Sequence, residues 1–128
     1  MAAHDIPDTP ETRAAMEQAQ TDALQRNGLK AGTVELWEDG YRAAKAADST
    51  FEWWYFDCQL DDGSTLVVTF SNKPHTAPDG PVTPTLLVIR QQPDGSSVHL
   101  EPAFGAEEFS ASTERCDVRI GASTVRGD

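Results

Sequence analysis

The densest apolar stretch of the chain, residues 51–60, reads Phe-Glu-Trp-Trp-Tyr-Phe-Asp-Cys-Gln-Leu and runs into Asp-Asp-Gly at residues 61–63. Aromatic residues favour strands, and an Asp-Gly pair after such a run is typical of a hairpin turn. Side chains of a strand alternate between its two faces. One face then carries Glu52, Trp54, Phe56, Cys58 and Leu60, and the other carries Phe51, Trp53, Tyr55, Asp57 and Gln59. Because both faces are aromatic, we expect each to be covered, by protein or by a bound apolar molecule.

Short apolar segments separated by turn signals fill most of the remaining chain. Residues 65–72 follow the turn at 61–63 and are predicted to form a hairpin with residues 51–60. Residues 73–84 are rich in proline and turn residues and predict a loop at the rim of the sheet. Further strands are predicted at 34–37, 85–91, 97–101, 115–120 and 124–126, with residues 102–108 irregular. The pattern indicates a mainly β fold, an antiparallel meander or barrel of roughly seven strands.

One helix is predicted ahead of the strands. Thr9 is a typical N-cap, Pro10 suits the first helical position, and Asn27-Gly28 provides the stop. The apolar positions between them form a narrow stripe of Met16, Ala19, Ala23 and Leu24. Such a stripe is typical of a surface helix that lies on another part of the protein.

The chain divides into residues 1–32, an N-terminal helical extension, and residues 33–128, the first part of a β-domain. The last residues, Val-Arg-Gly-Asp, fall inside a predicted strand that has no partner strand after it. An unpaired edge is an aggregation hazard. We therefore expect the remainder of the domain on a missing or separate polypeptide.

Charge and composition narrow the possible functions. The net charge of −11 argues against a nucleic-acid binder and against adhesion to an anionic membrane. The sequence shows no leader peptide and no run long enough to span a bilayer, so we expect a soluble, cytoplasmic protein without membrane insertion. Cys58 and Cys116 are expected as free thiols, although a disulfide stays possible. His4, His75 and His99 lack partners at ligand spacing, so no metal is expected.

Residues 51–57, Phe-Glu-Trp-Trp-Tyr-Phe-Asp, followed by Asp-Asp-Gly-Ser at 61–64 and the strand into Phe70, resemble the opening signature of the carotenoid 1,2-hydratase (hydroxyneurosporene synthase) and AttH-like superfamily. Residues 117–121, with Gly127 and Asp128, resemble a later strand pair of the same proteins. The Glu-Trp-Trp-Tyr core is the specific part of this resemblance. It extends from Gly32 onward and does not include the helix.

The resemblance implies a lipocalin-like antiparallel β-sandwich or barrel, incomplete in this chain, with a hydrophobic ligand cavity at or between two such domains. It also implies that the complementary C-terminal polypeptide of the same protein is a partner. By the motif, Glu52 lies in the cavity as the catalytic residue. The substrate-binding positions would be Trp54 and Phe56, by alternation, and Thr69 and Thr85, on neighbouring strands. A salt-bridged, structural Glu52 is the alternative.

Members of this superfamily include hydratases, polyene-cyclising enzymes and lipid-handling proteins, so three functions follow. The first is an enzyme that encloses a hydrophobic polyene and cyclises it by a Diels–Alder type (4+2) reaction without a cofactor, which asks for a shaped apolar cavity and one or two hydrogen bonds. The second is a hydratase of isoprenoid double bonds, which needs a proton donor. The third is a lipid carrier without chemistry. A structural or adhesion module would have no apolar pocket.

Overall fold

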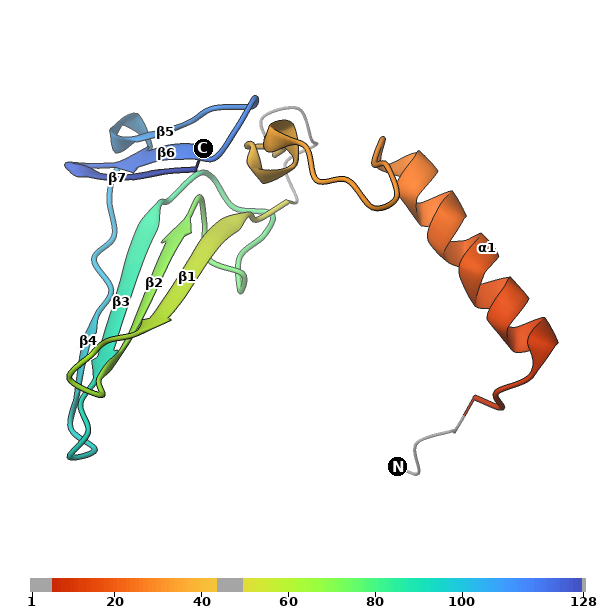
Figure 1. The fold of residues 1–128 in the computed structure, drawn as a ribbon. Helices are drawn as coiled ribbons and strands as arrows, with labels where there is room; N and C mark the ends of the chain where they lie inside the picture. Colours follow the sequence, from red (N-terminus) through yellow and green to blue (C-terminus); the bar gives the residue numbers. More distant parts are fainter. Residues whose placement is uncertain (1–5, 44–49, 128) are drawn as a thin grey trace.

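The computed structural model describes residues 6–43 and 50–127, which form one α-helix, two short 3₁₀ helices (Leu36–Asp39 and Ala106–Glu108) and two antiparallel sheets (Figure 1). His4, most of the Ala-rich connector predicted after Arg42, and the terminal Asp128 lie outside the described residues. No helix of the described part is long and apolar enough to cross a membrane. The chain is thus mainly β, as the alternating pattern predicted.

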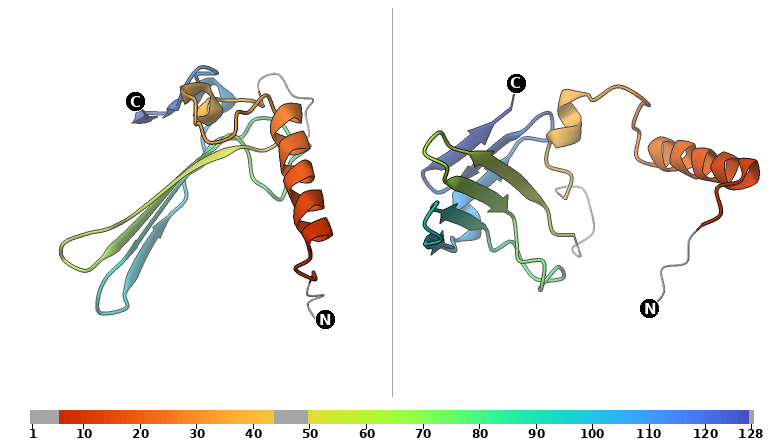
Figure 2. Two further views of the ribbon diagram at one scale, coloured as in Figure 1. Left: turned by 45° about the vertical axis from the view of Figure 1, so that its right-hand side comes forward. Right: turned by 60° about the horizontal axis from the view of Figure 1, so that its bottom comes forward.

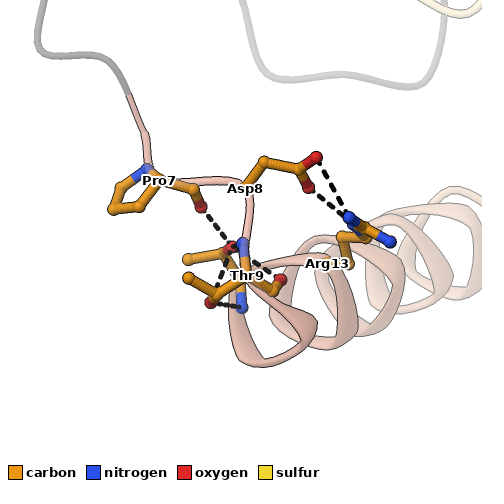
Figure 3. A network of polar contacts seen from close by, with 5 residues as sticks. Pro7, Asp8, Thr9 and Arg13 are labelled. Carbon is orange, nitrogen blue, oxygen red and sulfur yellow. Dashed lines mark hydrogen bonds and ion pairs between the residues drawn. The ribbon is translucent and has the colours of Figure 1, made fainter.

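Helix α1 spans Pro10–Arg26 and begins at the predicted N-cap. The Thr9 hydroxyl accepts a hydrogen bond from the backbone N–H of Thr12, and the Thr12 hydroxyl accepts one from the N–H of Thr9. The Asp8 carboxylate is paired with the Arg13 guanidinium at 2.5 Å (Figure 3). These contacts satisfy N–H groups that a helix start leaves free, and Gly28, at φ +68°, ends the helix.

The first sheet is a four-stranded meander in the order β1-β2-β3-β4. Its strands are β1 Trp53–Gln59, β2 Thr65–Ser71, β3 Thr85–Gln91 and β4 Ser97–Leu100. The register places Trp54 opposite Phe70 and Phe70 opposite Leu86. The predicted hairpin of residues 51–60 and 65–72 is therefore confirmed.

The second sheet has three short strands in the order β5-β6-β7. They are β5 Phe109–Ala111, β6 Asp117–Ile120 and β7 Ser123–Arg126. This sheet packs against one end of the first sheet (Figures 1 and 2). The buried core between them contains Trp54, Phe70, Cys116, Val118 and Ile120.

Trp54 is the centre of this core. Its indole ring lies 5.9 Å from Tyr41 and 6.5 Å from Phe109, between ring centroids, and the Tyr41 and Phe109 rings meet edge to face at 5.3 Å. The indole N–H donates to the backbone carbonyl of Asp39 at 2.8 Å, so its polar atom is satisfied within the core. Only the Trp54 end of this sheet face is covered in this way.

Several predictions of the fold were wrong. The segment expected as a strand at residues 34–37 instead contributes to a 3₁₀ helix, Leu36–Asp39, because the Glu35 carboxylate binds the Lys30 ammonium and the Trp37 indole while Glu38 caps the turn. Strand β5 lies in a segment for which no strand was predicted.

The expected seating of α1 was also wrong. No residue of the helix is buried, Met16 is 61% exposed, and the helix stands apart from both sheets in each view (Figures 1 and 2). Near the end of the helix, the Trp37 ring lies 3.9 Å from the position that a Cβ on Gly28 would take. A stripe of mostly alanines offers too little apolar area to hold the helix on a sheet.

Both sheets are open in the part of the chain that the structure describes, because each is an unclosed row of strands. The chain exposes 9316 Å² of surface. A folded monomer of 13.9 kDa exposes about 6,700 Å² by the usual scaling with mass.

Candidate functional site: a groove on the aromatic face of the first sheet

A half-open groove of about 560 Å³ lies on the first sheet. It crosses β1, β2 and β3 at the end where β1 begins, on the face opposite Trp54, and reaches Glu101 just after β4. Its size is within the range of ligand pockets. The groove lies on the opposite face from the one that the resemblance favoured for the cavity.

Aromatic rings of the β1 side form one wall. Phe51, Trp53 and Tyr55 follow one another at alternate positions and therefore share a face. The rings of Phe51 and Trp53 stack at 5.0 Å with an interplanar angle of 10°. Trp53 is 52% exposed and Tyr55 is 53% exposed, so this wall presents apolar surface that the described residues do not cover.

The floor comes from β2 and β3 and mixes hydroxyls with one aliphatic side chain. Thr69 lies opposite Tyr55 and Leu87, and Ser71 lies opposite Trp53 and Thr85. All of these floor residues line the groove. A ligand on the aromatic wall would thus meet three hydroxyl groups, each able to donate or accept a hydrogen bond.

The rim is formed by the loop after β2 and the end of β4. Residues 73–76 overhang the groove, and the His75 ring lies 6.2 Å from the Phe51 ring. The buried Lys73 ammonium donates to the carbonyls of Pro78 and Gly80 at 3.1 and 3.0 Å, which fixes the loop. Glu101, at the opposite end of the groove, places a carboxylate 3.6 Å from the His99 ring nitrogen.

The clearest perturbed carboxylates lie outside the groove, in the hairpin turns. The Ser64 hydroxyl and N–H hold the pKa of Asp62 below its ordinary value of 3.8, with help from Arg90. The Ser96 hydroxyl and N–H do the same for the pKa of Asp94. Both belong to tight turns with a glycine at positive φ, so they serve the hairpins rather than a ligand.

Two of the residues predicted from the sequence, Thr69 and Thr85, line the groove together. Glu52, Trp54 and Phe56 are not among its lining residues, because alternation places them on the other face. Trp54 is buried in the core, and Phe56 is 40% exposed beyond the small sheet.

Glu52 sits at the junction of two segments. Its carboxylate accepts hydrogen bonds from the backbone N–H groups of Arg42 and Ala43, at 2.9 to 3.2 Å, and its own N–H donates to the Asn72 side chain at 2.7 Å. These contacts are those of a structural carboxylate. A catalytic role for Glu52 stays a prediction that the groove itself does not support.

Sequence reasoning did not select several groove residues, chiefly Trp53, Tyr55, Leu87 and Glu101. The signal for the first two was present, because alternation already placed them on one aromatic face. The motif, however, favours the face of Glu52. Leu87 and Glu101 depend on the β2–β3–β4 register, which the sequence alone did not fix.

Among residues 6–43 and 50–127, no group of three or more His, Cys, Asp or Glu side chains could hold a metal ion. Cys58 is exposed and Cys116 is buried, and both are free thiols. Burial raises the pKa of the Cys116 thiol. The groove therefore offers shape, aromatic surface and hydrogen bonds.

Comparison with family models, with curated proteins and with solved structures gave no match.

Proposed function

We propose that this protein binds an elongated hydrophobic polyene, of polyketide or isoprenoid origin, in the groove and promotes its cyclisation by a Diels–Alder type (4+2) reaction. The observation that carries the proposal is the exposed aromatic wall of Phe51, Trp53 and Tyr55 beside a floor of hydroxyls. An apolar chain with one carbonyl group matches this surface, with the chain on the rings and the carbonyl on a hydroxyl. The resemblance of residues 51–57 to polyene-cyclising proteins supports the same class of ligand.

A cycloaddition needs few catalytic groups from the protein. The ligand forms two carbon–carbon bonds within itself, and no proton or leaving group has to be supplied. A groove that restricts a flexible polyene to folded conformers lowers the entropic part of the barrier. A hydrogen bond from Thr69, Ser71 or Thr85 to a conjugated carbonyl would polarise the alkene that reacts.

Hydration of an isoprenoid double bond is the second candidate, and Glu101 is the observation that favours it. This carboxyl lines the groove and would serve as the proton donor to an alkene bound there. Glu52, the acid expected from the motif, is engaged with backbone N–H groups on the other face. A carrier role needs the groove and no acid.

We also propose that the complementary C-terminal polypeptide covers the Trp54 face of the first sheet and so completes a lipocalin-like sandwich. The Trp54 face of the first sheet continues past the small sheet as Phe56, Val98 and Leu100, which are 40%, 51% and 56% exposed. An apolar face of this extent on a sheet suits a second packed layer. Such a layer would lie on the opposite side of the first sheet from the groove.

The test is incubation of the protein with a linear polyene that carries a conjugated diene and an activated alkene, followed by liquid chromatography and mass spectrometry. Cyclisation gives a product of unchanged mass that has lost the diene absorbance. Hydration gives the mass of one added water, and a carrier returns the ligand unchanged but retained by the protein.

Trp53→Ala is expected to slow the reaction, whereas Leu100→Ala, an apolar truncation on the other face, is expected to leave it unchanged. Equal product with and without protein contradicts the catalytic proposal. Failure of the ligand to be retained at all contradicts the binding site as well.

A further inference from the structure

The outer edge of β1 is a strand edge without the usual protection. In the β1–β2 ladder the Glu52 carbonyl accepts from Asn72 and the Leu60 N–H donates to Ser64. Hydrogen-bonded pairs alternate in an antiparallel ladder, so the backbone N–H and C=O groups of the even-numbered β1 residues point to β2. The backbone groups of Trp53, Tyr55, Asp57 and Gln59 therefore point outward. No neighbouring strand of the described chain meets these groups.

Proteins normally block such an edge with charged side chains, above all lysine, with proline, with a bulge or by keeping the strand very short. β1 has seven residues in unbroken register, contains no lysine or proline and a single charged side chain, Asp57, and carries exposed aromatic side chains on both faces. The opposite edge, β4, has only four residues, two of them Ser97 and His99. The β1 edge is therefore the one suited to pairing with another strand.

We infer that the β1 edge pairs antiparallel with the same edge of a second copy of this chain, joining the two four-stranded sheets into one continuous sheet across a two-fold axis. An interface between identical patches must be self-complementary. If the two-fold axis passes between the two copies of Phe56, all seven residues of β1 pair with the other copy. Tyr55 of one copy then lies opposite Asp57 of the other. Shifting the centre to Asp57 would set two like charges opposite each other, and shifting it to Tyr55 shortens the overlap.

Aromatic surface along the β1 edge is open to a second copy. Trp53, Tyr55 and Phe56 are 52%, 53% and 40% exposed, so the pairing would cover apolar surface that the described residues leave open. Phe56, 40% exposed, would pack on its symmetry mate in a pair that is not hydrogen-bonded, where side chains approach most closely. The aromatic walls of the two grooves would then meet at the new seam.

Charge opposes the association at long range, because each copy carries a net charge of −11. Screening by salt weakens that repulsion. The dimer is therefore expected to tighten as salt is raised, which is the opposite of an interface held by ion pairs.

Sedimentation equilibrium of the whole chain over a range of concentrations tests the association, and the expected mass is twice 13.9 kDa. Asp57→Pro removes an N–H that points to the outer edge and leaves the even-numbered bonds to β2 in place. It is expected to weaken dimerisation about tenfold or more with an unchanged far-ultraviolet spectrum. A monomer at every concentration overturns the inference.

Disulfide trapping tests the register. In the Cys58→Ser background, Phe56→Cys places two thiols across the axis, where Cα atoms about 4.5 Å apart permit a disulfide. Val98→Cys on β4, a similarly exposed position on the same face, is the matched control. Rapid dimer formation by the first variant and slow formation by the second is expected. If the Val98 variant forms the disulfide dimer as readily as the Phe56 variant, the proposed edge is wrong. It is also wrong if the Phe56 variant forms no disulfide dimer.

Discussion

The Glu52 carboxylate ties the segment before the first sheet to the start of β1. Three hydrogen-bond distances, between 2.9 and 3.2 Å, join its two oxygens to the N–H groups of Arg42 and Ala43. Neighbouring Asn72, which is fully buried, accepts from the Glu52 N–H and meets the Tyr41 hydroxyl. Glu52 thus connects the segment that carries Tyr41, a core residue, to the sheet.

Substitution of Glu52 by Gln is expected to destabilise the protein by about 1–2 kcal/mol, because an ionised acceptor of backbone N–H groups is replaced by a neutral one. Urea denaturation followed by tryptophan fluorescence measures the change. Glu101→Gln, at an exposed position, is the control and should leave the midpoint unchanged. Loss of activity in Glu52→Gln at unchanged stability would contradict the structural role and restore the catalytic one.

Asp62 in the β1–β2 turn makes stability depend on pH. The Ser64 hydroxyl and N–H hold its pKa below 3.8, so the folded chain binds a proton there less readily than the unfolded chain. The contribution is present above pH 3.8 and is lost as the pH falls through the lowered pKa. The urea midpoint should therefore fall as the pH drops below that value.

Ser64→Ala keeps the Asp62 carboxylate but removes the hydroxyl that lowers its pKa most. This variant is expected to show a shallower fall of the midpoint in acid than the parent protein. Identical pH profiles for the two proteins would show that the turn does not contribute.

Among the elements, the tight turns depend on glycine in the left-handed region. Gly95, at φ +85° in the β3–β4 turn, has no atom within 4 Å of an added Cβ, whereas Gly121, at φ +58° in the β6–β7 turn, would place that Cβ 2.9 Å from the Phe104 ring. Gly95→Ala is expected to cost about 1 kcal/mol from backbone strain alone. Gly121→Ala should cost about 1–3 kcal/mol more, from overpacking. Chemical denaturation of the two variants checks this, and equal losses would contradict the packing of Phe104 under the turn.

The hairpins that sequence alone identified, β1–β2 and β3–β4, combine apolar segments with an Asp-Gly or Pro-Asp-Gly turn. The same reasoning failed at residues 34–37, because apolar content suggested a strand while Glu35 and Glu38 could satisfy local backbone and indole N–H groups and favour a 3₁₀ turn. It also missed β5, whose three residues are too short for a periodic signal. Start and stop signals of α1 were sufficient to give its bounds, because capping is local.

For the whole molecule, the sequence indicated two aromatic faces on β1 but not which one would be open. That choice depends on the small β5–β6–β7 sheet, which covers Trp54 and leaves Trp53 and Tyr55 exposed. Thr69 and Thr85 line the groove because they lie in register with the exposed face. Glu52 and Trp54 lie on the other face, because a motif identifies residues without saying which sheet will pack on them.

Binding of an apolar chain in the groove is common to the cyclase, the hydratase and the carrier functions. The direct measurement is a fluorescence titration with cis-parinaric acid, a fatty acid with four conjugated double bonds, against the parent protein, Trp53→Ala and Leu100→Ala. The parent and the Leu100 variant are expected to bind one equivalent per chain with the same affinity. The Trp53 variant should bind about tenfold more weakly, because it loses about 1.4 kcal/mol of aromatic contact. Equal affinity of all three proteins, or no saturable binding by the parent, would contradict the account.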